Sequence, residues 1–391
     1  MSYKIPFIGR AHKYNQIEID SVVSAMVSAI PLTQGHHLKD FQEKFCQYTG
    51  SKNSFAVNNA TAALELSAQL CQFKDGDEVI IPGHTYTSSA YPFLKKGAKI
   101  VWADIDLDTR VINADSIKKC ISDKTKAIVV VHLYGYGADM PSIMRLAQER
   151  GLIVVEDAAQ ALGVEINGKM AGTFGDFGIF SFHSHKNITT LGEGGMLTVK
   201  DDEIAKILPM LRHNGHCSFN YDREAYWKPA MGNVDLPVLN NEFLWPNNYC
   251  LGEVECALGF KLIDRIDQVN QEKRDRAIMF IDELLEFPEL QFHRENSKRH
   301  NYHLLVAQIS GKKRDQFIKE MSENKSIQCV VQYYPLYRYD LYIKAGQNDY
   351  NCPNTDNFFD SMISFPFHHM MSEADFSYLL QSTKEVLLNL K

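Results

Sequence analysis

Short apolar runs rich in β-branched residues alternate with helix-length amphipathic segments through the first two thirds of this 391-residue chain. The clearest apolar runs are 78–81, 99–102, 127–131 and 152–156, and helices are expected between them, for example over 61–73 and 141–150. Strands that are apolar on both faces are typical of parallel sheets covered by helices on each side. The alternation therefore predicts an α/β fold with a mostly parallel central sheet.

Polar residues follow two of these predicted strands where each ends. His132 comes directly after the run 127–131, and Glu156 and Asp157 close the run that starts at residue 152. In open α/β sheets the carboxyl ends of the strands line the ligand crevice. We therefore expect these three side chains to face a bound ligand.

The chain is longer than the ~250–300 residues at which single hydrophobic cores stop growing. We predict a large domain over 1–252 and a smaller α+β domain over 253–391, the latter with a long helix over 253–285, strands at 304–307 and 329–333, and a final helix over 373–388. Between 217 and 248 the alternation stops and aromatic residues gather among prolines. This segment is expected to be a long loop or lid, which either serves the function or packs a subunit interface.

Charge and cysteine content narrow the function classes. With 41 basic and 48 acidic residues the formal net charge is −7, and no run of basic residues is present, so nucleic acid is not an expected partner. Eight cysteines without a CxxC pair are typical of reduced thiols. No signal-like start or membrane-length apolar window is seen, so a cytoplasmic protein without a membrane partner is expected.

One lysine, Lys186, is embedded in the aromatic and glycine-rich stretch 172–186, which the turn-like segment 192–195 follows. Burial disfavours an ammonium ion, lowers its pKa and makes the amine nucleophilic. Lys186 is therefore either a lysine that forms a Schiff base or an exposed lysine at a strand end. The residue types alone leave both interpretations open.

The sequence resembles the sugar aminotransferases of the DegT/DnrJ/StrS type, which are pyridoxal-phosphate enzymes of fold type I. The resemblance covers the whole chain and rests on separated motifs, namely GSKNSFAVNNATAA (50–63), GDEVIIPGHTY (76–86), VHLYG (131–135), EDAAQ (156–160), SFHSHK (181–186), GEGG (192–195), LRHNG (211–215), CPNT (352–355) and SFPF (364–367). It implies a large domain with a mostly parallel sheet, a small C-terminal domain, and pyridoxal 5'-phosphate as cofactor.

The resemblance also implies roles for particular residues. Lys186 corresponds to the lysine that joins the cofactor aldehyde and moves the proton, and Asp157 to the partner of the pyridinium nitrogen. The resemblance implies further cofactor contacts. Gln160 would bind the phenolic oxygen and Tyr86 would stack on the ring. The phosphate would be bound by Thr61, Ala62 and Ser181, and also by Asn248 of the neighbouring subunit in a homodimer. Without the resemblance, Asp157 and Thr61 could equally be helix caps, and Tyr86 a core residue.

The expected reaction is transfer of an amino group from L-glutamate to a keto or aldehyde sugar in lipopolysaccharide or O-antigen biosynthesis. The acceptor is either a nucleotide-linked keto-deoxysugar or an oxidised 3-deoxy-octulosonic acid, giving a product of the 8-amino-3,8-dideoxy-octulosonate type. Three departures from the family pattern fall where the sugar is expected to bind. Cys250 replaces a common arginine, Tyr337 replaces a common histidine, and the segment 217–248 is long and aromatic.

Three other readings remain open. A dehydratase branch of the same family has histidine in place of the lysine, and here His185 precedes Lys186. A metal enzyme could use the histidine pairs at 183 and 185, 36–37 or 368–369, but no third ligand stands at regular spacing, so no metal is expected. A sensor that keeps the scaffold without catalysis would have no use for the combination of Asp157 and Lys186.

Overall fold

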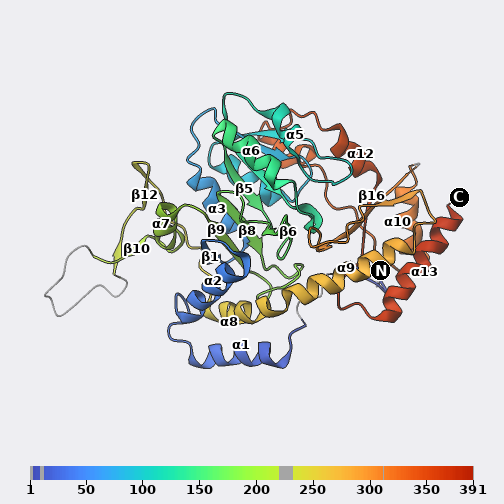
Figure 1. The fold of residues 1–391 in the computed structure, drawn as a ribbon, viewed down its shortest axis with the longest axis horizontal. Coiled ribbons are helices and arrows are strands. Elements are labelled where there is room, and N and C mark those ends of the chain that lie inside the picture. Colours follow the sequence, from blue (N-terminus) through green and yellow to red (C-terminus); the bar gives the residue numbers. More distant parts are fainter. Residues whose placement is uncertain (1–2, 9–12, 220–231, 311, 391) are drawn as a thin grey trace.

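The computed structural model of the protein describes residues 3–8, 13–219, 232–310 and 312–390. A seven-stranded sheet with the order β1-β9-β8-β5-β4-β2-β3 forms the centre of the larger part of the molecule (Figure 1). Its strands are β1 (Asn53–Val57), β2 (Glu78–Pro82), β3 (Lys99–Ala103), β4 (Thr125–Val131), β5 (Ile153–Asp157), β8 (Phe177–Ser181) and β9 (Gly195–Val199). The four strands predicted from the apolar runs are all present, each within two residues of its expected ends.

The sheet is mostly parallel. Strands β3, β2, β4, β5 and β8 run parallel to one another, whereas β9 is antiparallel to both β8 and β1. This confirms the predicted α/β fold with a mostly parallel sheet. The antiparallel β8–β9 pair is a hairpin, and it brings Ser181 at the end of β8 opposite Gly195 at the start of β9.

Helices connect the strands and cover the sheet. They are α1 (Gln16–Ser28), α2 (His36–Thr49), α3 (Ala60–Leu70), η1 (Thr87–Ser89), α4 (Tyr91–Lys95), α5 (Ala114–Cys120), η2 (Leu133–Gly135), α6 (Met140–Arg150) and α7 (Asp202–Arg212). Their ends follow ordinary capping chemistry: α6 starts with the Asp139 side chain accepting from the Ser142 amide and ends at Gly151 with a φ of 62°. The pair β6 (Glu165–Ile166) and β7 (Lys169–Met170) forms a small separate hairpin.

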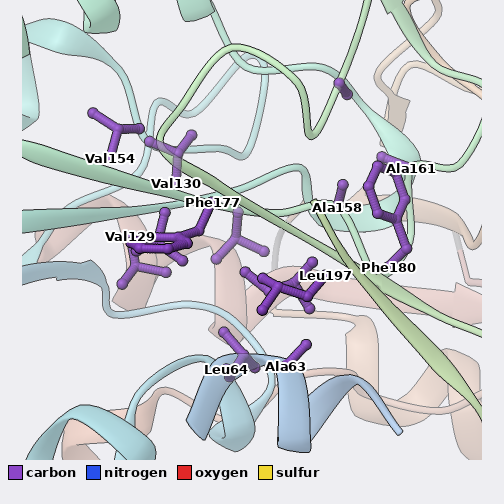
Figure 2. Packing of buried hydrophobic residues seen from close by; sticks show 14 of the residues in the cluster. Ala63, Leu64, Val129, Val130, Val154, Ala158, Ala161, Phe177, Phe180 and Leu197 are labelled. Carbon is purple, nitrogen blue, oxygen red and sulfur yellow. The ribbon is translucent and has the colours of Figure 1, made fainter. Parts of the chain in front are cut away.

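The main hydrophobic core lies between the sheet and these helices. Val129 and Val130 of β4 and Leu197 of β9 are fully buried, and Ala63 and Leu64 of α3 pack below them (Figure 2). The alternation of buried strands and half-apolar helices in the sequence is the direct cause of this layered core, because each helix buries only its apolar face.

A second apolar cluster forms in the C-terminal part. Its elements are β14 (Leu290–Phe292), β15 (Leu305–Ile309), α10 (Arg314–Glu323), η4 (Leu336–Arg338), α11 (Asp340–Lys344), α12 (Pro353–Ser361), β16 (Met362–Phe365) and α13 (Glu373–Asn389). Strand β15 pairs with β14 and β16 in a three-stranded antiparallel sheet. The cluster gathers residues from 277 onward and also Ile5 near the N-terminus.

The segment that joins the two clusters differs from the prediction. Instead of one helix over 253–285, the chain forms α8 (Glu253–Leu262), the short turn η3 (Ile263–Arg265) and α9 (Ile266–Asp282). Helix α8 packs on α1 and α2, and α9 continues towards α10 and α13 (Figure 1). The main cluster extends to Ile266, so α9 carries side chains of both clusters, and the domain boundary at residue 252 stays a prediction.

Two further expectations were wrong in detail. Residues 329–333 form no strand, only an isolated bridge between Val330 and Ser364 on the free edge of β16. The loop expected over 217–248 contains two small hairpins, made by β10 (His216–Cys217) with β11 (Asn233–Val234) and by β12 (Val238–Leu239) with β13 (Glu242–Phe243). The rest of that segment, 220–231, lies outside the described residues. In the part of the chain that the structure describes, no helix is both long and apolar enough to cross a membrane.

Candidate active site

A cavity of about 650 Å³ opens where the carboxyl ends of β4 and β5 meet the start of α3 and the β8–β9 turn. Most of the residues expected to hold a cofactor line it. They are Thr61, Ala62, Tyr86, Asp157, Gln160, Ser181 and Lys186. The topology thus brings together side chains that are up to 125 positions apart in the sequence, between Thr61 and Lys186.

Lys186 lies in the turn of the β8–β9 hairpin. Its amide donates to the His183 carbonyl at 2.8 Å, which fixes the turn, and its half-buried side chain reaches the cavity. Burial lowers the pKa of the Lys186 amine to about 8, and the nearby Asp157 carboxylate partly opposes this effect. A larger fraction of the amine is therefore neutral and nucleophilic at physiological pH than for an ordinary lysine.

Asp157 ends β5 and is almost fully buried. Its Oδ2 accepts a hydrogen bond from the Ser89 hydroxyl at 2.6 Å, and its Oδ1 accepts from the Ala159 amide at 3.1 Å. The Ser89 hydroxyl also lies 3.0 Å from that of Thr85. No helix starts at Asp157, so the alternative reading as a helix cap is wrong. Ser89 was not predicted from the sequence, because it lies three residues after the end of the motif 76–86.

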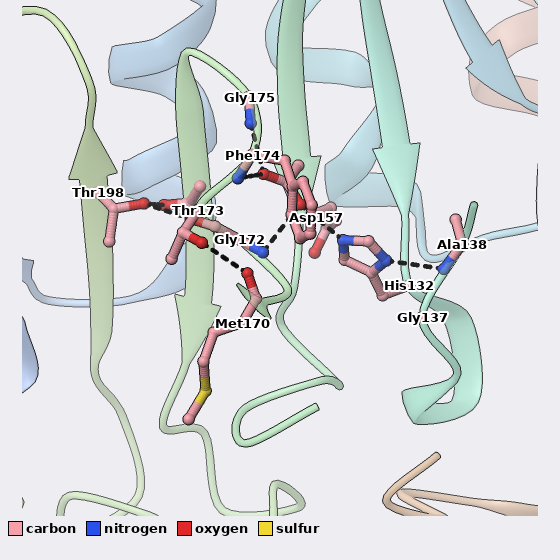
Figure 3. Close-up of polar contacts among 12 residues, drawn as sticks. His132, Gly137, Ala138, Asp157, Met170, Gly172, Thr173, Phe174, Gly175 and Thr198 are labelled. Carbon is pink, nitrogen blue, oxygen red and sulfur yellow. Dashed lines mark hydrogen bonds and ion pairs between the residues drawn. The ribbon is translucent and has the colours of Figure 1, made fainter. Parts of the chain in front are cut away.

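Glu156 and His132 were expected to face the ligand, and this expectation was wrong. Successive side chains on a strand point to opposite faces, so Glu156 points away from the cavity that Asp157 lines. Its carboxylate accepts from the amides of Gly172, Phe174 and Gly175 and lies 3.0 Å from His132 Nε2. Figure 3 shows this buried network, in which His132 Nδ1 in turn accepts from the Ala138 amide. The network therefore stabilises the end of β5 on the side away from the cavity.

The start of α3 forms one end of the cavity. The Asn59 side chain caps the helix by accepting from the Ala62 amide at 2.8 Å, so the alternative in which Thr61 is the cap is wrong. The Thr61 hydroxyl instead donates to Ser88 at 3.0 Å. A Cβ at Gly195 would lie 2.6 Å from the Asn59 carbonyl carbon, so only glycine lets β9 approach the helix start this closely. Helix N-termini carry unpaired amides that favour anions.

Gln160 is held in place from both ends of its amide. Its Oε1 accepts from the Tyr134 amide at 2.7 Å, and its Nε2 donates to the Tyr333 hydroxyl at 2.9 Å. The Tyr333 ring meets the Tyr86 ring edge-on at 5.9 Å between centroids, and Tyr86 is 54% exposed. Tyr333 was not singled out from the sequence, because its partner Gln160 lies 173 positions away.

Three positions tied to substrate or cofactor lie outside the cavity of their own chain. Asn248 is exposed, and its backbone bridges to His213. Cys250 contacts the Arg212 carbonyl, with 3.8 Å between sulfur and oxygen. Tyr337 is buried, where its hydroxyl donates to Asp356 and its ring stacks on Tyr350. The expectation that Cys250 and Tyr337 stand at the sugar site is therefore not met within one chain.

Comparison with known proteins identifies the family of this chain. A sequence profile of the DegT/DnrJ/EryC1/StrS aminotransferase family matches residues 14–384. The chain belongs to this family. It is an aminotransferase, and the resemblance seen in the sequence is confirmed. It is 30% identical to the spore coat polysaccharide biosynthesis protein SpsC of Bacillus subtilis, over 99% of this chain and 97% of that protein.

Two further similarities bear on the chemistry of this aminotransferase. It is 31% identical to the GDP-perosamine synthase of Vibrio cholerae, over 87% of this chain and 86% of that one. A Streptococcus pneumoniae sugar aminotransferase structure in its PMP form matches with a TM-score of 0.87 and 27% identity, over 99% of this chain and 100% of that one, and its PLP form is known as well. Pyridoxal phosphate is the cofactor of this aminotransferase, and sugars are its substrate class.

Proposed function

We propose that Lys186 binds pyridoxal phosphate covalently in this cavity and that the enzyme moves an amino group from L-glutamate to a keto or aldehyde carbon of a sugar. One observation carries the proposal: a half-buried amine with a pKa lowered to about 8 shares a cavity with a buried carboxylate that a hydroxyl group orients. When bound, pyridoxal phosphate supplies an aldehyde that condenses with amines and a ring that withdraws electrons.

The residues present fit that cofactor. The start of α3 with Asn59 and Ala62, and the Ser181 hydroxyl opposite Gly195, form a neutral donor-rich end suited to a phosphate. The Asp157 carboxylate, fixed by Ser89, suits a protonated ring nitrogen. Gln160, whose Nε2 faces Tyr333, suits the phenolic oxygen, and Tyr86 is exposed enough to stack on a ring.

Lys186 serves a second purpose in this proposal. With the cofactor bound, the Lys186 amine would hold it and would also serve as the base and acid that moves a proton between the substrate carbon and the cofactor. A pKa near neutrality suits both steps, because the amine must accept and release the proton at the same pH. The alternative dehydratase reaction requires histidine at this position, and here the lysine side chain, not only His185, reaches the cavity.

A homodimer with shared active sites is part of the proposal. Helix α1 and the residues after it expose apolar side chains, with the exposed fractions Ile17 (68%), Val23 (51%), Met26 (63%), Val27 (83%), Ile30 (92%) and Leu32 (58%). Contiguous exposed apolar surface of this kind is typical of protein interfaces. Asn248, which stands outside its own cavity, would then reach the phosphate of the second copy.

The acceptor has two candidate classes. The similarity to a GDP-perosamine synthase favours a nucleotide-linked keto-deoxysugar, and the similarity to a polysaccharide biosynthesis protein favours a surface polysaccharide such as lipopolysaccharide as the destination. The second class is an oxidised 3-deoxy-octulosonic acid, which carries a carboxylate and no nucleotide. A sensor on the same scaffold would explain neither the perturbed amine nor its acidic partner.

The experiment incubates the holoenzyme with L-glutamate and a panel of both acceptor classes and identifies aminated products by mass. We expect 2-oxoglutarate and one aminated sugar to form in equal amounts. Lys186→Ala should abolish product and the imine absorbance of the cofactor, whereas Lys206→Ala, at an exposed position of α7, should change neither. Full activity in Lys186→Ala would refute the proposal.

A further inference from the structure

Residues after position 270 build a basic wall of the cavity. Lys273 comes from α9, His303 from the segment just before β15, and His369 from the connection between β16 and α13. All three side chains are at least nine-tenths buried, and Lys273 is only 4% exposed. We call these three residues the basic corner. None of them belongs to the motifs that identify the cofactor site.

The basic corner is tied to the turn that carries Lys186. Lys273 Nζ donates to the side-chain oxygen of Asn187 at 3.0 Å and to the His303 carbonyl at 2.9 Å. His303 Nδ1 lies 3.4 Å from the same Asn187 oxygen. An ammonium group has three hydrogens, so one hydrogen of Lys273 has no acceptor among the described residues. His303 Nε2 likewise has no hydrogen-bond partner in the described part of the chain.

Among the described residues, no acidic side chain contributes to the pKa shifts of the three residues of the basic corner. Burial lowers the pKa of Lys273 to about 7, and no ion pair of Lys273 occurs in the described residues. Burial, followed by the positive charges of Lys186 and Lys273, holds the pKa of His303 well below its usual range. The pKa of His369 falls to about 3 through burial and the neighbouring cations, Lys273 first among them. A buried amine without an anionic partner loses its charge easily, and an anionic ligand in the cavity would restore that charge, so the position of Lys273 in the cavity wall points to an anionic ligand.

The other charged groups of the cavity are already occupied. Glu65 pairs with Lys95 at 2.5 Å, and Glu193 lies 3.8 Å from His183. No arginine is among the described residues that line the cavity. Arg212 is buried behind it and donates to the Ala56 carbonyl and to two glutamine side chains. With Lys186 committed to the cofactor, Lys273 is the lysine that remains for an anionic substrate group.

We propose that the basic corner, Lys273 together with the imidazole edges of His303 and His369, binds a carboxylate of the substrate. A carboxylate offers several acceptor sites, one of which matches the unused hydrogen of Lys273. Because His303 Nδ1 donates to Asn187, its Nε2 donates as well only when the negative charge of the bound carboxylate keeps the ring protonated. This inference rests on the proposed function, because both substrates then enter the same cavity in turn. The carboxylate belongs either to the glutamate donor or to an acidic sugar acceptor, and the two sources can be separated.

The test titrates the holoenzyme with two unreactive or slowly reacting probes in a calorimeter, glutarate for the donor and 3-deoxy-octulosonic acid for an acidic acceptor. Loss of a charge-assisted hydrogen bond predicts a tenfold to about hundredfold weaker affinity in Lys273→Met. If Lys273→Met binds only glutarate more weakly, the basic corner binds the carboxylate of the donor. If it binds only the sugar acid more weakly, the corner binds the acceptor. If it binds both more weakly, the corner binds donor and acceptor in turn. Lys206→Met on α7 is the control and should bind both probes as the wild type does.

Two further measurements separate this inference from the proposed function. The cofactor absorbance of Lys273→Met should match that of the wild type, which shows that the cofactor site is intact. If Lys273→Met does not fold, His369→Phe takes its place, with a smaller expected loss of affinity for the same probe. Unchanged affinity for both probes in an intact holoenzyme would overturn the inference, while failure of the wild type to load the cofactor would instead refute the proposed function.

Discussion

The buried carboxylate of Glu156 supports the strand end that carries Asp157, and replacing it by an amide tests that support. Oε1 of Glu156 accepts from the amides of Phe174 and Gly175 at 2.5 and 2.6 Å, and Oε2 accepts from the Gly172 amide at 2.9 Å and faces His132 at 3.0 Å. The Ala138 amide donates to His132 Nδ1, so a neutral His132 carries its proton on Nε2 and donates as well.

Glu156→Gln converts one of the two accepting oxygens into an NH₂ group. Two of the four donors then face another donor in a fully buried site. Each unsatisfied buried donor costs about 1–3 kcal/mol, so the free energy of unfolding should fall by about 2–6 kcal/mol. Urea unfolding of the apoprotein measures this as a lower midpoint at an unchanged slope.

The control is Glu203→Gln, an exposed residue of α7 whose ion pair with Lys206 is also exposed. Its stability should change by less than about 0.5 kcal/mol. A loss below about 1 kcal/mol in Glu156→Gln would refute the reasoning, since it would mean that the amides of 172–175 find other acceptors. A large loss combined with normal cofactor affinity would show that the network supports the fold without shaping the site.

Three predictions concern the cofactor site. Because the pKa of Lys186 is lowered to about 8, the rate at which apoenzyme takes up pyridoxal phosphate should rise with pH and level off above about pH 8–9, in stopped-flow absorbance; a rise continuing towards 10.5 would contradict this. Asp157→Asn should slow the glutamate half-reaction by about 100-fold, and an unchanged single-turnover rate would show that the ring nitrogen has another partner. Gly195→Ala, whose Cβ would meet Asn59 and Ala60 backbone atoms at 2.6–2.7 Å, should weaken cofactor binding by about tenfold in equilibrium titration, and normal affinity would place the phosphate elsewhere.

Much of the fold could be predicted, because the strands of a buried parallel sheet have continuous apolar sequences. The hairpin β8–β9 and the seven-strand order could not, because pairing depends on contacts between distant segments. The break of 253–285 into two helices was also missed, because the segment contains no proline to signal it, and the packing of α8 on α1 and α2 involves distant parts of the sequence.

The residues proposed to hold the cofactor were predicted from motifs, and most of them line the cavity, whereas the residues that contact them were not predicted. Ser89, Tyr333 and Lys273 each act through a partner far away in sequence, and none stands in a distinctive pattern. Glu156 and His132 were placed at the right strand ends but on the wrong face, because a run that is apolar on both sides does not reveal which side holds the ligand. The expectation for Tyr337 failed for a similar reason, since a motif position does not state the direction of its side chain.

The β8–β9 hairpin carries three residues of the proposed cofactor site. Ser181 ends its first strand, Lys186 occupies its turn and Gly195 opens its second strand. Insertion or deletion of a single residue in this turn would displace the Lys186 amine relative to Ser181 and the start of α3, so the proposed spacing between amine and phosphate depends on the length of the turn.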